Sequence, residues 1–182
     1  MRWLYDFDME AFRAIHVGMH RDWLDPIFWL LTSTGLGWVQ AILILMLLIW
    51  KPTRRFTGPL LAVLIVSGVF VSDVVKLIVH RERPSNLVFA HPQETEFGAN
   101  SFPSGHTTTA FAIAILLFLM TRKKEYAWVG QVALGWAALV GLSRIYRGVH
   151  WPTDVIAGAF AGLFSACLVY LAFGLNKETA AE

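Results

Sequence analysis

Five long stretches without a charged side chain constrain the fold of this 182-residue chain more than any other feature. They are Pro26–Trp50, Phe56–Ser72 with an apolar pattern that continues to Val79, Thr107–Thr121, Tyr126–Ser143 and Val155–Asn176. A helix needs about 20 apolar residues to cross the hydrocarbon core of a bilayer. A soluble protein with five such segments would have too little polar sequence to cover its surface. The sequence therefore predicts an all-α, polytopic transmembrane helical bundle of five to six spans.

The composition supports this fold class and excludes several others. Hydrophobic residues make up 56% of the chain and charged residues 15%, whereas ordinary soluble domains are about 25% charged. The net charge of +2 is too small for a nucleic-acid partner, and the one cysteine, Cys167, excludes a disulfide framework. Because we find no linker or repeat, we predict one domain over residues 1–182, with the transmembrane bundle at 26–176.

Residues 1–25 differ from the rest, because charged and apolar side chains alternate there. This pattern predicts an amphipathic helix that lies in the membrane interface. The segment lacks the basic, apolar and small-residue regions of a signal peptide. A sixth, weakly hydrophobic span is the alternative interpretation.

The basic residues of the short turns predict the orientation in the membrane. With five spans, one face of the bundle carries Lys51, Arg54, Arg55, Arg122, Lys123, Lys124 and Lys177. Cytoplasmic loops are enriched in Lys and Arg, so this face should be cytoplasmic. The opposite face then holds the N-terminal segment, the loop His80–Pro103 and the turn Tyr146–Pro152.

Three polar groups stand at predicted helix ends, and the topology brings all three to that opposite face. They are Lys76 with Arg81, Arg83 and Pro84; Pro103, Ser104, Gly105 and His106; and Ser143 and Arg144 with His150 and Asp154. Charges at the ends of membrane helices are costly unless they are paired or functional. We therefore expect these groups to converge on one functional site.

The cations of these groups are suited to a multiply charged anion. Lys76, Arg83 and Arg144 would converge on one point, and arginine forks match phosphate oxygens. Ser104 is a favourable N-cap and Gly105 allows close approach of the backbone. The free N–H groups of the helix that follows would form an anion site.

The remaining polar residues are suited to nucleophilic and acid–base chemistry. His150 and Asp154 are four residues apart, with Pro152 suited to the first turn of a helix. Asp154 could hold one ring nitrogen of His150 and leave the other as a nucleophile. His106 could serve as general acid. Together with the cations, these residues predict a phosphoryl-transfer site.

The three groups resemble the three signature motifs of the type 2 phosphatidic acid phosphatase (PAP2) superfamily of membrane lipid phosphatases. The matching segments have the forms K-x6-R-P from Lys76, P-S-G-H from Pro103 and S-R-x5-H-x3-D from Ser143. The resemblance implies a phosphohistidine at His150, orientation of His150 by Asp154, and proton transfer to the leaving oxygen by His106. It also implies that Lys76, Arg83, Arg144, Ser104 and Gly105 hold the phosphate, with Ser143 and Pro103 supporting, and that the enzyme uses no metal or cofactor.

The resemblance further implies a substrate class, and the charges of the turns imply a location. We expect a lipid phosphate substrate, with undecaprenyl pyrophosphate favoured over phosphatidylglycerol phosphate and phosphatidic acid. The site would face the extracytoplasmic side of a bacterial-type cytoplasmic membrane. A lipid-phosphate transporter or flippase is the alternative of another class, and a vanadate-binding haloperoxidase is disfavoured by the hydrophobicity. The sequence predicts no oligomeric state.

Other polar residues have simpler interpretations. We interpret Asp73 as a partner of Lys76, and Arg81 and Arg147 as rim residues. His16 and His20 have the spacing of metal ligands but lack a third ligand. The pair Gly158 and Gly162 favours close packing within the bundle over a dimer face.

Overall fold

The computed structural model describes residues 2–94 and 100–175, and every regular element in these ranges is helical. The all-α prediction is therefore confirmed. The α-helices are α1 (Arg2–Phe12), α2 (Asp25–Thr34), α3 (Gly37–Met46), α4 (Arg54–Ile65), α5 (Val74–Ile78), α6 (Gly105–Thr121), α7 (Trp128–Tyr146) and α8 (Pro152–Ala172). Two segments are π-helical, η1 (Arg13–Val17) and η3 (Val66–Asp73), and two are 3₁₀ turns, η2 (Lys51–Thr53) and η4 (Pro84–Asn86).

Helix α6 is the centre of the bundle. It packs mainly on α7 and α8, and it also contacts α4 and η3. A Cβ atom added at Gly162 of α8 would lie 2.6 Å from the carbonyl oxygen of Thr108. One added at Gly158 would lie 2.9 Å from the carbonyl oxygen of Ser104. The two glycines therefore bring the backbones of α6 and α8 together, as predicted for packing within the bundle.

Within residues 2–94 and 100–175, three helices are long and apolar enough to cross a membrane: Lys51–Ile78, Trp128–Tyr146 and Pro152–Ala172. The helices α2 and α3 together pass the same test, but they are bent by 66° at the break between them. Helix α6 is apolar and shorter, with 17 residues. The predicted span Pro26–Trp50 is thus interrupted between Thr34 and Gly37. Asn176 and Lys177, which the sequence analysis used, lie outside the described residues.

The bend between α2 and α3 occurs where two helices leave no room for a side chain. A Cβ atom at Gly35 would lie 2.8 Å from Cγ1 of Val140 in α7 and 2.9 Å from Cδ2 of His106 in α6. Glycine at this position therefore lets the chain turn directly against the start of α6.

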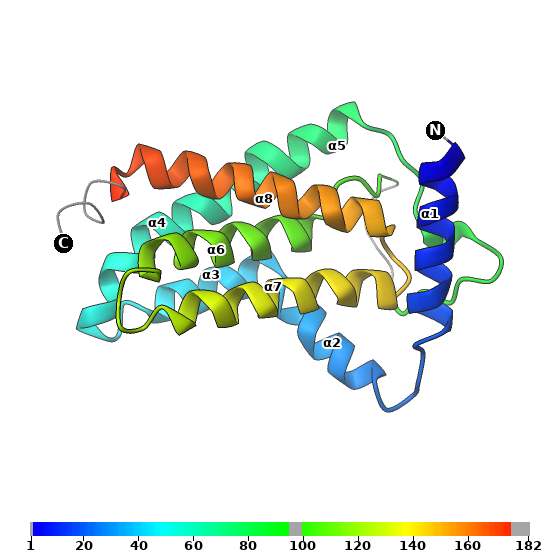
Figure 1. The fold of residues 1–182 in the computed structure, drawn as a ribbon, viewed down its shortest axis with the longest axis horizontal. Helices are drawn as coiled ribbons and strands as arrows, with labels where there is room; N and C mark the ends of the chain where they lie inside the picture. The colour runs from blue at the N-terminus through cyan, green and yellow to red at the C-terminus, as the bar shows by residue number, and fades with distance from the viewer. Residues whose placement is uncertain (1, 95–99, 176–182) are drawn as a thin grey trace.

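The amphipathic segment at the N-terminus forms the helix α1, which lies across one end of the bundle (Figure 1). One of its faces buries Asp8 and Phe12 completely. Phe12 packs on Trp151 and Phe89 with ring centroids 5.5 and 6.4 Å apart. Trp3 on the other face is 72% exposed. Helix α1 is therefore attached to the loops that precede α6 and α8.

The two basic turns lie together at the opposite end of the bundle from α1. The η2 turn and the turn between α6 and α7 are both at this end (Figure 1). The guanidinium of Arg55, in the first turn of α4 directly after η2, contacts the hydroxyl of Tyr126 in the turn between α6 and α7. The starts of α6 and α8 and the end of α7 are at the end where α1 lies. The basic turns and the three motifs are thus separated by the length of the bundle.

Candidate active site

A pocket of about 390 Å³ lies where the three predicted polar groups meet. Its lining includes Lys76 from the first group, Gly105 and His106 from the second, and His150 from the third. A Cβ atom at Gly105 would lie 3.5 Å from Nζ of Lys76, so the ammonium group reaches the start of α6. The predicted convergence of these residues is therefore present in the structure.

His150 lies in the turn between α7 and α8 and is 2% exposed. Its Nε2 is 3.3 Å from Nη1 of Arg83, and its Nδ1 is 3.4 Å from Oδ2 of Asp154. This second approach has the distance of an ion pair without the alignment of a hydrogen bond. Burial, and then the positive charges of Arg144 and Arg83, hold the pKa of His150 well below its usual range. The imidazole is therefore neutral and retains a lone pair.

The turn that carries His150 depends on one glycine. Gly148 has a φ of 77°, a left-handed conformation that other residues rarely adopt. A Cβ atom there would also lie 2.8 Å from the ring of His16. Glycine therefore allows α7 to end tightly enough for His150 to fold back over Arg144, whose carbonyl oxygen accepts the His150 N–H at 3.3 Å.

Asp154 is fully buried in the first turn of α8. Its Oδ2 accepts the backbone N–H of Trp151 at 2.9 Å, which caps the helix. Its Oδ1 accepts a hydrogen bond from Nη1 of Arg81 at 2.7 Å. The carboxylate is thus fixed from two directions and faces Nδ1 of His150.

The two predicted arginines lie near His150, and the positive charge of each lowers its pKa. Arg83 donates to the carbonyl oxygen of Val149 at 2.9 Å. Burial lowers the pKa of Arg83, but an arginine remains charged in proteins. Arg144 is fully buried in α7 and contacts the hydroxyl of Thr32 and the carboxylate of Glu94. Both cations are thus near the imidazole.

Three residues that were predicted to assist have local structural contacts. The N-cap position of α6 is Ser104, but its hydroxyl does not bond a backbone N–H; Oγ accepts the hydroxyl of Thr107 at 2.9 Å. The capping prediction was therefore wrong for the side chain. Ser143 donates to the carbonyl oxygen of Val140 at 2.6 Å inside α7. Pro103 is buried directly before the turn that starts α6.

The sequence reasoning missed Glu94 and misplaced two arginines. The carboxylate of Glu94 pairs with Arg144 and lies 3.4 Å from Nε of Arg147. Arg147 is only 4% exposed, and Arg81 bridges two buried carboxylates. The rim interpretation of both was therefore wrong. The one available signal was the spacing of Arg81 and Arg83, because residues two apart in extended chain project to the same side.

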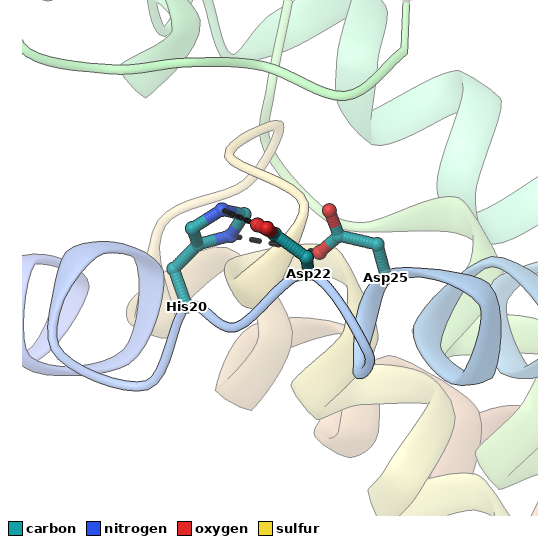
Figure 2. Close-up of side chains that lie close together, drawn as sticks. All are labelled: His20, Asp22 and Asp25. Carbon is teal, nitrogen blue, oxygen red and sulfur yellow. Dashed lines mark ion pairs between the residues drawn. The ribbon is translucent and has the colours of Figure 1, made fainter.

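His20, Asp22 and Asp25 lie close together (Figure 2), and none of them lines this pocket. The ring nitrogens of His20 are 3.7 Å from Asp22 and 3.5 Å from Asp25. Oδ1 of Asp25 also accepts the hydroxyl of Tyr146 at 2.7 Å and the amide of Gln93 at 2.8 Å. The cluster therefore links the start of α2 to the end of α7.

Comparison with known proteins gives a consistent result. The family model described as the PAP2 superfamily matches residues 56–178. A bacitracin transport permease protein BcrC of Bacillus licheniformis is 33% identical over 91% of this chain and 80% of its own length. An undecaprenyl-diphosphatase of Sulfolobus acidocaldarius is 32% identical over 86% of this chain and 73% of its own length.

A solved structure has the same fold. The crystal structure of a transmembrane PAP2 type phosphatidylglycerolphosphate phosphatase from Bacillus subtilis superposes with a TM-score of 0.76. It is 26% identical in sequence, and the match covers 98% of this chain and 88% of that one.

Proposed function

The chain belongs to the PAP2 superfamily of membrane lipid phosphatases, and we propose that it hydrolyses undecaprenyl pyrophosphate to undecaprenyl phosphate and inorganic phosphate. One observation carries the proposal: side chains from all three motifs line a single pocket of about 390 Å³ at one end of the bundle. A neutral imidazole backed by a carboxylate and surrounded by cations is suited to in-line attack on phosphorus.

In the first step, Nε2 of His150 forms a bond to the terminal phosphorus, and the bond from that phosphorus to the bridging oxygen breaks. His106 donates a proton to the leaving oxygen, so undecaprenyl phosphate departs. Asp154 stabilises the charge that develops on the imidazole through Nδ1, 3.4 Å away. Lys76, Arg83 and Arg144 stabilise the equatorial oxygens, with help from the Gly105 N–H.

In the second step, water attacks the phosphohistidine. His106, now unprotonated, accepts a proton from this water, and the N–P bond breaks to release inorganic phosphate and restore His150. Because each proton given to the leaving oxygen is recovered from water, the cycle leaves the enzyme unchanged. Every group in this scheme is a side chain or backbone N–H of the chain, so we propose that catalysis needs no metal or cofactor.

We propose five spans: α2 with α3, Lys51–Ile78, α6, α7 and α8. Helix α1 would then lie in the membrane interface over the pocket, because Trp3 and Phe7, four residues apart on one face of it, are exposed. The basic turns at the far end favour a cytoplasmic position for that end. The pocket would then face the extracytoplasmic side of a bacterial-type cytoplasmic membrane.

A second cavity supports a long apolar chain on the substrate. It has a volume of about 760 Å³ and a mostly apolar lining, and it borders α3, α4, α6 and α7. Gln40, Leu60 and Ile113 line it, each about one helical turn beyond Gly37, Leu64 and Thr109 of the catalytic pocket. A prenyl tail whose pyrophosphate occupies the pocket could extend into this cavity.

Phosphatidylglycerol phosphate is the second candidate substrate, because the solved phosphatase that covers 98% of this chain is named for it. The test is phosphate release by the purified protein in detergent with excess chelator, with undecaprenyl pyrophosphate, phosphatidylglycerol phosphate and phosphatidic acid competing. We expect the highest kcat/KM for undecaprenyl pyrophosphate, and no turnover by His150→Ala. A higher kcat/KM for phosphatidylglycerol phosphate would make that lipid the assigned substrate in place of undecaprenyl pyrophosphate. Turnover by His150→Ala would refute the assignment of His150 as the nucleophile.

A further inference from the structure

Asp154 is held on the side away from His150 by an arginine that lines no part of the catalytic pocket. Nη1 of Arg81 donates to Oδ1 of Asp154 at 2.7 Å, while Oδ2 faces Nδ1 of His150. The same Nη1 also donates to the hydroxyl of Thr153 at 2.6 Å. Arg81 therefore fixes the direction of the carboxylate from behind.

The same guanidinium reaches the N-terminal helix. Nη2 of Arg81 pairs with Oδ2 of Asp8 in α1. Asp8 is fully buried, and its oxygens also accept the backbone N–H of Thr153 at 2.9 Å and the Thr153 hydroxyl at 2.6 Å. A carboxylate from α1 thus binds the first turn of α8, where the helix dipole favours negative charge.

These contacts place two buried carboxylates on one arginine. Asp8 and Asp154 are both 0% exposed, and a buried carboxylate without a cation is strongly disfavoured in its charged form. A planar guanidinium can donate to two carboxylates at once through different N–H groups, whereas a lysine ammonium presents a single point charge. Arg81 is therefore the residue type that this arrangement requires.

We propose that Asp8 and Arg81 are positioning residues for the reaction: Asp8 holds Arg81, Arg81 holds Asp154, and Asp154 orients His150. This inference rests on the proposed function. Nη1 and Nη2 of Arg81 are engaged by Thr153, Asp154 and Asp8, so both residues act on the chemical step and not on substrate binding. By this inference, helix α1 contributes to catalysis because it carries Asp8.

The test compares steady-state hydrolysis of undecaprenyl pyrophosphate by Arg81→Gln and Arg81→Lys with that of the unmodified protein. We expect Arg81→Gln to lower kcat by about 10- to 100-fold, as loss of an outer hydrogen-bond partner does elsewhere. KM should change by less than about threefold, because no contact to the phosphate is lost. Arg81→Lys should recover part of kcat, because it restores the charge but not the bridge.

Asp8→Asn tests the contribution of α1, and Asp6→Asn is its matched control. Asp6 is in the same helix and is exposed. We expect Asp8→Asn to lower kcat and Asp6→Asn to leave it unchanged. The double variant Asp8→Asn/Arg81→Gln should resemble Arg81→Gln alone, since Asp8 acts through Arg81. Thermal unfolding in detergent identifies any variant that does not fold.

Several outcomes would overturn the inference. An unchanged kcat in Arg81→Gln would do so, and so would a rise in KM at constant kcat, because Arg81 would then bind the substrate. If Arg81→Gln does not fold, equal kcat values for Asp8→Asn and Asp6→Asn would overturn it. The variant His150→Ala distinguishes failure of the positioning inference from failure of the proposed function. Turnover by His150→Ala would refute the assignment of His150 as nucleophile. An inactive His150→Ala together with an unchanged kcat in Arg81→Gln would refute only the positioning role of Asp8 and Arg81.

Discussion

Replacement of Gly162 by alanine should separate α8 from α6 and disturb the active site at a distance. The added Cβ would lie 2.6 Å from the carbonyl oxygen of Thr108, 2.8 Å from the backbone nitrogen of Ala112 and 2.9 Å from Cβ of Phe111. Backbone atoms cannot rotate away, so the helices must part by about 0.8 Å to restore an ordinary contact. Overpacking of this kind costs roughly 1–3 kcal/mol.

The matched control is Gly135→Ala in α7, because nothing lies within 4 Å of a Cβ atom at Gly135. There the substitution should gain up to about 1 kcal/mol through helix propensity. Gly162→Ala gains the same helix propensity, so the two variants should differ by the overpacking cost alone, about 1–3 kcal/mol, or roughly 2–12 °C in Tm for a chain of this size. Thermal unfolding in detergent, followed by tryptophan fluorescence, measures this difference.

Activity should respond as well, because α8 carries Asp154 and α6 carries His106. A displacement of this order between reacting groups can cost about 100-fold in rate, so we expect at least a tenfold lower kcat for Gly162→Ala and an unchanged kcat for Gly135→Ala. Equal Tm and equal kcat for the two variants would show that α6 and α8 are not packed through this glycine.

Three further predictions concern the end of the bundle that holds the pocket. His16 accepts the His91 N–H at 3.0 Å through Nε2, with Nδ1 2.7 Å from the carbonyl oxygen of Tyr146, and burial lowers its pKa below 6.5. As the pH decreases, the unfolded chain therefore binds a proton at His16 before the folded chain does, so the contribution of neutral His16 to stability is complete above about pH 6.5 and falls below it. His16→Gln should therefore reduce the decline in Tm between pH 7 and 5. An unchanged dependence of Tm on pH would contradict this. Phe12→Ala removes a fully buried ring and should destabilise the packing of α1 on the bundle by about 3–5 kcal/mol. A protease should then cleave the chain N-terminal to Gly18 faster than it cleaves the unmodified protein. An equal rate of cleavage would argue against this. Glu94→Gln removes the negative charge beside Arg144 and Arg147, so inorganic phosphate should inhibit more strongly, with a Ki lowered by about threefold to tenfold; an unchanged Ki would exclude competition between Glu94 and phosphate.

The sequence predicted that the three motifs converge, because residue type and helix-end position sufficed for this. Uncharged runs indicated which segments are helices, and the three motifs indicated which ends meet. Lys76, His106 and His150 accordingly line one pocket. Their convergence followed from topology alone, because antiparallel helices return to the same face.

The sequence could not predict contacts made by segments without a periodic pattern. Glu94 lies in the long loop before α6, and nothing in its neighbours indicates that it reaches Arg144. Asp8 looked like one charge of an exposed face, but a pairing across 145 residues with Thr153 buries it. Position Ser104 was identified correctly, whereas the direction of its hydroxyl depends on Thr107 one turn later.

The break between α2 and α3 has a consequence for hydration. At bilayer depth, irregular backbone is stable only where protein surrounds it or where it borders a wet chamber. Gly35 and Gly37 both border the catalytic pocket, so we expect the kink to keep a small reservoir of solvent below the headgroup layer. In the proposed mechanism, hydrolysis of the phosphohistidine would consume one molecule of that solvent in every cycle.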